Sequence, residues 1–140
     1  MDDWHNNAKN ANFENYINRI SDNGVYIGTD FSENWSKKDF KSFSKPYFDK
    51  KETWNFKTIE RNIYFSKDKN TAWFDELLNT WMGVCRGSGV LVKQKKTWKI
   101  RHYVLSVSIP NDEIQKVIQL KKIKDSIFLK KHNKHKLLKT

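Results

Sequence analysis

This sequence of 140 residues has little cysteine and no long apolar run. Its one cysteine, Cys85, excludes an internal disulfide and is typical of a protein of the reducing cytoplasm. No apolar run approaches the roughly 18 residues that a membrane-spanning helix needs. The chain opens with Met1-Asp2-Asp3-Trp4-His5, which lacks the basic and apolar regions of a secretory signal. We therefore expect a cytoplasmic protein without a membrane partner.

The sequence motifs that indicate a cofactor site or a metal site are also missing. The sequence contains no glycine-rich phosphate loop and no nucleophile elbow, since Gly87-Ser88-Gly89 lies inside an expected strand and opens no helix. His132 and His135 are the best metal suggestion. No third ligand accompanies them, and the lysines around them repel a cation. We expect no metal and no cofactor.

Acidic residues are outnumbered, and the excess positive charge is unevenly distributed. The chain has 27 lysines and arginines against 16 acids, a formal net charge of +11. Residues 121–140 hold eight lysines and one acid, or +7, so the rest of the chain carries only +4. A basic chain invites comparison with nucleic-acid binders, but a terminal lysine run is usually a solvated appendage that attracts anions weakly. Residues 130–140 also lack the interleaved aromatics of single-strand binders, so nucleic acid is the partner we expect least.

Aromatic residues are abundant, at 14% of the chain, and they argue for a folded protein with one core. Helical periodicity predicts a first helix that Asp2 or Asp3 caps and that ends at Gly24. A short strand is expected over 25–29. The capping box of Ser36 and Asp39 then opens a helix that should end near Pro46.

From residue 53 the apolar pattern changes to a period of two. It predicts long strands over 54–65, 71–81, 85–93 and 98–108, with a bulge near Thr58 and Ile59 where the alternation slips. A helix follows over 113–129, and a flexible basic tail over 130–140. Two helices and a run of antiparallel strands predict an α+β fold.

Three segments of the chain resemble a known family: Gly28-Thr29-Asp30 through Trp35, Ala72-Trp73-Phe74-Asp75-Glu76, and Arg86-Gly87-Ser88-Gly89-Val90-Leu91 leading into Trp98-Lys99-Ile100. In this order and spacing the chain resembles the SnoaL-like (polyketide-cyclase-like) proteins of the nuclear-transport-factor-2-like superfamily. The resemblance implies a domain over 1–112 in which a curved antiparallel sheet wraps around N-terminal helices as a cone with a cavity. It also implies a homodimer through the back of the sheet. Members include isomerases, cyclases and dehydratases that use no cofactor, and non-catalytic binding or assembly domains.

The hairpin turn at Lys95-Lys96 gives a register for the last two strands. With a two-residue loop, Gln94 opposes Thr97, Leu91 opposes Ile100 and Gly89 opposes His102. The face that we assign to the inside of the cone consists of Gly87, Gly89, Leu91, Trp98, Ile100, His102 and Val104. The opposite face consists of Arg86, Ser88, Val90, Val92, Lys99, Arg101, Tyr103 and Leu105. A bulge would exchange the faces, because a slip of one residue inverts every later side chain.

His102 and Asp75 are the candidate catalytic residues. A neutral imidazole can transfer a proton near neutral pH, and a carboxylate beside tryptophans would have a raised pKa suited to a base. Asp75 and Glu76 lie on opposite faces of one strand, so at most one points inward, and we prefer Asp75. The alternatives are a histidine held by a structural hydrogen bond and a carboxylate paired with Arg86.

The candidate ligand-binding residues are Trp35, Trp54, Trp73, Arg86, Trp98 and Tyr103. Arg86 would hold a ligand carboxylate with its two-pronged guanidinium or would bridge a neighbouring acid, and the tryptophans divide between core and pocket rim. The leading hypothesis is a domain that binds a small, partly apolar organic molecule in the cone. The alternatives are a non-catalytic dimeric assembly module, whose cone would be filled by aromatic side chains, and a weak anion or nucleic-acid contact through the lysine tail.

Overall fold

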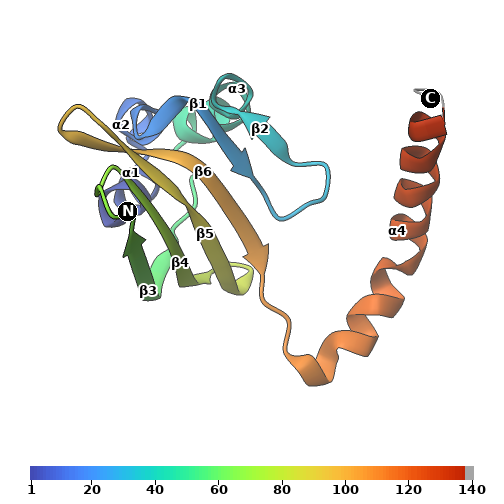
Figure 1. The fold of residues 1–140 in the computed structure, drawn as a ribbon. Helices are drawn as coiled ribbons and strands as arrows, with labels where there is room; N and C mark the ends of the chain where they lie inside the picture. Colours follow the sequence, from blue (N-terminus) through green and yellow to red (C-terminus); the bar gives the residue numbers. More distant parts are fainter. Residues whose placement is uncertain (138–140) are drawn as a thin grey trace. The chain divides into compact units, whose positions relative to one another are not determined.

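The computed structural model describes the backbone of residues 1–137 and the side chains of residues 1–134. It forms two separate compact units, Met1–Ser108 and the segment from Ile109 onwards. In the first unit three helices lie against one face of a curved sheet of six strands (Figure 1). The helices are α1 (Asp2–Lys9), α2 (Phe13–Asn18) and α3 (Lys37–Asp49). The strands are β1 (Ile20–Ile27), β2 (Asn34–Ser36), β3 (Lys57–Phe65), β4 (Thr71–Thr80), β5 (Gly83–Gln94) and β6 (Thr97–Val107).

The strand order of the sheet is β2-β1-β6-β5-β4-β3. Strands β3 to β6 form a meander of antiparallel neighbours, whereas β1 runs parallel to β6. This is the α+β architecture that the sequence predicted, with the three helices of the first unit covering the inner face of the sheet.

The first predicted helix is in fact two helices and the start of a strand. The chain turns at Ala11, which has a positive φ of 53°, and α2 ends at Asn18. Gly24 does not end a helix as predicted, because it lies inside β1, whose pairing with β6 is irregular between Ile20 and Val25. A Cβ on Gly24 would lie 2.5 Å from Cγ2 of Ile20 and 2.9 Å from the carbonyl oxygens of Ser21 and Ile100, so the irregular part of β1 and its neighbour β6 leave no room for a side chain here.

The predicted cap of α3 is confirmed, since the Ser36 hydroxyl accepts a hydrogen bond from the Asp39 amide at 3.2 Å. The predicted end at Pro46 is wrong, because the helix continues to Asp49 with the proline inside it. Pro46 has no N–H to donate, but the next turn places Phe48 in the core, 5.2 Å from the ring of Tyr16. We infer that this burial offsets the missing hydrogen bond.

The strand predictions hold in outline and fail at one position. The bulge near Thr58 is confirmed, as are the pairs Gln94–Thr97 and Leu91–Ile100. The next pair is Val90–His102, so Arg101 is an extra residue in β6 and forms a second bulge. Gly89 therefore faces Tyr103, and the predicted faces of β6 are reversed from His102 onward.

The core lies between the helices and the inner face of the sheet and is strongly aromatic. Trp4 stacks on Tyr16 with ring centroids 5.0 Å apart, and Tyr103 meets Trp4 edge-on at 4.8 Å. Tyr26, Phe40, Phe48, Phe56 and Phe74 are also buried there. Much of the predicted cavity is thus filled by side chains.

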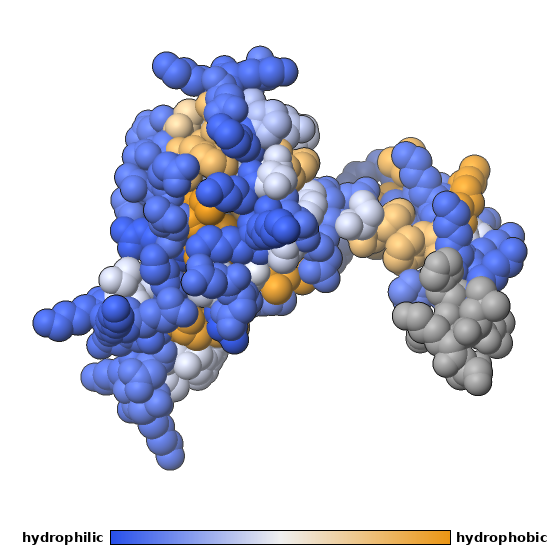
Figure 2. Space-filling model, turned by 90° about the horizontal axis from the view of Figure 1, so that it is seen from above, coloured by the Kyte–Doolittle hydropathy of each residue, from blue (hydrophilic) through white to orange (hydrophobic). Residues whose placement is uncertain are grey.

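The second unit is a helix, α4 (Ile114–Leu137), which follows a short 3-10 turn, η1 (Asn111–Glu113). Residues 130–137 of the expected flexible tail are helical, and residues 138–140 lie outside the described part of the chain. Hydrophobic and hydrophilic side chains are intermingled on this helix (Figure 2). Within residues 1–137, no helix has the combination of length and apolar content needed to cross a membrane.

Candidate functional site

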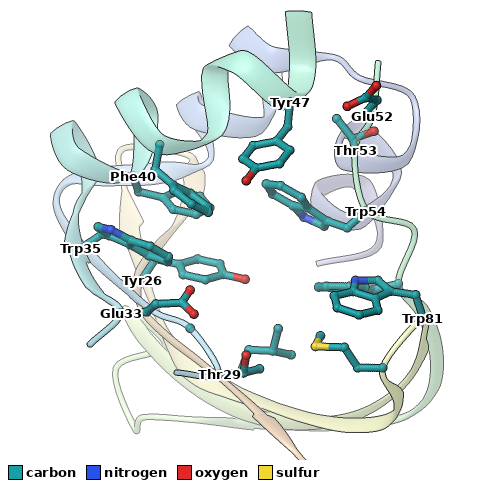
Figure 3. A pocket seen from close by; sticks show the side chains of 15 residues that line it. Tyr26, Thr29, Glu33, Trp35, Phe40, Tyr47, Glu52, Thr53, Trp54 and Trp81 are labelled. Atoms are coloured by element: carbon teal, nitrogen blue, oxygen red, sulfur yellow. The ribbon is translucent and has the colours of Figure 1, made fainter. Parts of the chain in front are cut away.

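A pocket of about 410 Å³ opens at one end of the first unit. Its walls come from the end of β1 and the loop after it, from α3, from the irregular segment before β3, and from the β4–β5 turn (Figure 3). The lining side chains are mostly aromatic. They include Tyr26, Trp35, Phe40, Phe43, Tyr47, Trp54, Phe56 and Trp81, together with Met82 and Leu105.

Two local features of the sequence hold these rings in place. The Ser36 cap fixes the first turn of α3, and Phe40, Phe43 and Tyr47 then follow at a helical spacing that places them on one face. Phe40 stacks on Tyr26 of β1 with centroids 4.1 Å apart, and Phe43 stacks on Trp35 at 4.4 Å. The wall of the pocket is therefore a set of packed rings rather than a group of separate side chains.

Polar groups enter the pocket from the same walls. Figure 3 shows the hydroxyl groups of Tyr26 and Tyr47 and the carboxylate of Glu33 directed towards the open space. Burial raises the pKa of the Tyr26 phenol, and the negative charge of Glu33 raises it further. Tyr26 is thus a neutral hydrogen-bonding group at physiological pH. Glu52 and Thr53 lie at the upper rim.

A second group of polar side chains is buried in the core. The Glu76 carboxylate is inaccessible to solvent and accepts hydrogen bonds from Tyr103 and from Arg61 Nε, both at 2.8 Å. His5 Nε2 lies 2.8 Å from the same carboxylate, and Asp2 pairs with the far side of Arg61. We call Glu76, His5, Tyr103, Arg61 and Asp2 the buried cluster.

The pKa of Glu76 reflects opposing influences. Burial alone would raise it, but the hydrogen bonds and charges of His5 and Arg61 outweigh burial and hold the pKa below its ordinary value. Burial and the nearby Glu76 charge raise the pKa of Tyr103. Among the described residues no buried side-chain nitrogen or oxygen lacks a hydrogen-bond partner. A cluster so fully paired is a structural ion network, and none of its members is among the described residues that line the pocket.

Residues 1–110 match the family described as the SnoaL-like domain, which is more than half of the chain. The chain belongs to the SnoaL-like domain family. No curated protein matches the sequence significantly.

Solved structures share the fold of this SnoaL-like domain at low sequence identity. An NTF2-like protein of unknown function from Pseudomonas putida has a TM-score of 0.66 at 11% identity, over 79% of this chain and 82% of that one. A candidate ketosteroid isomerase from Shewanella frigidimarina has a TM-score of 0.61 at 14% identity, over 75% and 89%. A candidate calcium/calmodulin-dependent protein kinase II association domain from Xanthomonas campestris has a TM-score of 0.59 at 18% identity, over 79% and 83%. The names of these proteins cover both catalysis and assembly, so the fold is shared across functions.

The SnoaL-like domain places neither predicted catalytic side chain in its pocket. Asp75 lies on the outer face of β4, where it accepts a hydrogen bond from Asn62 at 3.1 Å, and Glu76 is the inward acid. His102 lies on the outer face of β6 because the bulge at Arg101 inverts the strand. The expected inward orientation of Asp75 and His102 is therefore wrong.

The predicted ligand-binding residues are divided among three places. Trp35 and Trp54 line the pocket. Tyr103 is in the buried cluster, and Trp98 is packed beside Phe65 at 5.9 Å, away from the pocket lining. Trp73 and Arg86 lie on the outer face of the sheet, so Arg86 neither lines the pocket nor pairs with Glu76.

Several pocket residues were not anticipated from the sequence: Tyr26, Glu33, Phe43, Tyr47, Glu52 and Trp81. For Phe43 and Tyr47 the sequence held a signal, because they continue the apolar row of Phe40 along α3. In the structure their side chains remain 39% and 42% exposed. Trp81 gave no such signal, because the sequence placed it at the end of the predicted strand 71–81, whereas β4 ends at Thr80. Within residues 1–134 no cluster of three or more histidine, cysteine or acidic side chains has the arrangement of a metal site.

Proposed function

We propose that this SnoaL-like domain binds a small, partly apolar organic molecule in the pocket between β1, α3 and the β4–β5 turn. The observation that carries the proposal is the pocket itself. Its volume of about 410 Å³ lies in the range of small-molecule sites, and aromatic walls with a few converging polar groups are typical of them.

The exposure of the rings supports the same proposal. Trp81 is 82% exposed at the edge of the pocket, and two other lining rings, Phe43 and Tyr47, are partly exposed. Covering such rings with an apolar ligand removes them from water, which gains about 25 cal/mol per Å². A ligand also gains hydrogen bonds from the inward hydroxyls.

The proposal is for binding rather than for turnover. The isomerase, cyclase or dehydratase chemistry considered for this family needs an acid or base against the ligand. Asp75 and His102 are on the far side of the sheet, and Glu76 is enclosed by its own donors. The two acids among the described pocket-lining residues are Glu33, on the loop after β1, and Glu52, at the rim, and we assign both to recognition of the ligand.

The six tryptophans offer a test with an internal control. Trp35, Trp54 and Trp81 line the pocket, whereas Trp4, Trp73 and Trp98 do not. We expect a neutral probe, naphthylmethanol, to shift the indole N–H resonances of the first three in a nitrogen–proton correlation spectrum. The other three should remain in place. Saturating shifts confined to Trp73 or Trp98, or none at all, would exclude the pocket as the binding site.

A second candidate function, assembly as a homodimer, is favoured by the outer face of the sheet. Trp73 is 48% exposed there and stacks on Tyr64 at 6.1 Å, with Val90 paired beside it. Asp75 and Arg86 lie on this same face with opposite charges. A two-fold axis would bring this patch against its own copy in the partner, where the opposite charges of Asp75 and Arg86 could pair.

Sedimentation equilibrium tests the homodimer. Replacing Trp73 by lysine would place two cations near the axis and should weaken association at least tenfold, while Trp81→Lys at the pocket should leave it unchanged. A monomer at all protein concentrations, or equal effects of the two variants, would exclude this interface.

A further inference from the structure

The pocket has an uneven charge. The ionisable acids among its described lining residues are Glu33 and Glu52, and none of those residues is a lysine, arginine or histidine. This is unusual in a chain with a formal net charge of +11. The described residues show no ion pair to either acid. Within residues 1–134, no cation is paired with the negative charge of the pocket.

Glu33 is held in position by its own loop. The Gly28 amide donates to the Glu33 carbonyl at 2.9 Å, and the Asp30 amide donates to Glu33 Oε1 at 3.2 Å. The carboxylate lies directly over Gly28, where a side chain would collide with it. This arrangement fixes a negative charge at the inner wall next to Tyr26, instead of leaving it on a freely rotating side chain.

The rings of the pocket reinforce this preference. Aromatic faces carry partial negative charge and attract a cation within about 6 Å of the ring centroid. Tyr47 and Trp54 meet edge to face at 6.3 Å across from Tyr26 and Trp35, so rings bound the pocket on two sides. An anion would meet the same faces and both carboxylates, and would be repelled by each.

We propose that the ligand of this pocket is an organic cation, an ammonium group on an apolar or aromatic body. The inference rests on the proposed binding function and assigns the chemical class of the ligand. The ammonium lies near Glu33 with its apolar body between the rings of Trp35 and Trp54. Glu52 at the rim adds attraction as the cation approaches.

Three probes with one aromatic body test the charge preference: naphthylmethylammonium, naphthylmethanol and naphthoate. We expect the cation to bind about tenfold more tightly than the alcohol, and naphthoate to bind most weakly. Affinities come from titrating the indole resonance of Trp54 at neutral pH. If the alcohol binds as tightly as the cation, or naphthoate binds more tightly, the charge class is wrong but the pocket still binds small molecules. If none of the three binds, the proposed function fails as well.

Glu33→Gln locates the source of the preference. It keeps the shape of the side chain and an oxygen for the Asp30 amide, and it removes the charge. We expect the affinity for the cation to fall two- to fivefold, roughly the effect of one exposed ion pair, with the alcohol unaffected. Glu14→Gln on α2 changes the net charge equally at a position outside the pocket and should change neither affinity. An unchanged Trp4 indole resonance establishes that the core is intact. Equal losses for both variants, or none for Glu33→Gln, would overturn the assignment to this site.

Discussion

The buried cluster and the pocket lie in the same domain and are built from similar side chains, but they differ in how their polar groups are satisfied. In the buried cluster the Glu76 carboxylate accepts hydrogen bonds from Tyr103 and Arg61 and lies beside His5 Nε2. All of its partners therefore belong to the protein itself. In the pocket, Glu33, Tyr26 and Tyr47 point towards open space. A carboxylate among aromatic rings is thus not by itself a sign of function. The informative property is whether its partners are inside the protein or have to come from a ligand.

The largest loss of stability is expected when the Glu76 carboxylate of the buried cluster is removed. Glu76→Ala leaves Arg61 and His5 without their acceptor in the core, so we expect a loss of about 3–5 kcal/mol in the free energy of unfolding. Denaturant titration measures it. Asp75→Ala, on the outer face of the same strand, should cost less than about 1 kcal/mol. Similar losses for the two variants would contradict the description of the cluster as a closed network.

The next test concerns the space that Gly87 leaves for the cluster. A Cβ at this position would lie 2.9 Å from Glu76 Oε1 and closer still to the Tyr103 hydroxyl. We expect Gly87→Ala to destabilise the domain by about 1–3 kcal/mol through overpacking. The double variant with Tyr103→Phe removes the clashing hydroxyl, so its cost should be smaller than the sum of the single costs. Strict additivity in thermal or denaturant unfolding would show that the hydroxyl is not the obstacle.

Acid should weaken the buried cluster. Because the folded pKa of Glu76 is below its value in the unfolded chain, its stabilisation is complete above the unfolded value of 4.5 and is lost as the pH falls through the folded pKa. The stability difference between the wild type and Glu76→Gln should therefore shrink below about pH 4.5. Urea titrations at several pH values measure this, and a difference that grows on acidification would reverse the assigned direction.

The smallest effect on stability is expected in the pocket. Trp81 is mostly exposed, so Trp81→Ala should change the free energy of unfolding by about 0.5 kcal/mol or less. The same variant should weaken naphthylmethanol binding several-fold, because it removes one wall. A large loss of stability, with binding retained, would make Trp81 a core residue and not a ligand contact.

More of the fold than of the candidate site could be predicted from the sequence. Hairpin spacing gave the pairing of β5 and β6 correctly down to Leu91 and Ile100, and the slip near Thr58 identified the β3 bulge. The bulge at Arg101 was missed, although the buried residues of β6 are Ile100, Tyr103 and Leu105, and the interval of three marks the extra residue. That one error placed His102 on the wrong face.

The sequence pattern could not decide whether Asp75 or Glu76 faces inward, for a different reason. Alternation established that only one acid could face inward, and the buried Ala72, Phe74 and Leu78 share the parity of Glu76. Trp73 and Leu77 gave the other face a similar apolar content, so the pattern alone was ambiguous. The pocket is harder still to predict, because its residues come from a loop, a helix and a turn that are separated in the sequence by up to several tens of positions.

The parallel pairing of β1 with β6 has a consequence for how the molecule reaches its native state. Ile20–Ile27 lies between β2 and Thr97–Val107, so the centre of the sheet joins the beginning of the unit to its end. During synthesis β1 cannot join the strands of the meander until β6 has left the ribosome, because β6 is its neighbour on that side. Contacts so distant in sequence slow folding. Nascent chains that stop before residue 97 should therefore expose the aromatic rings of α1 and α2, and would be the species that chaperones must protect.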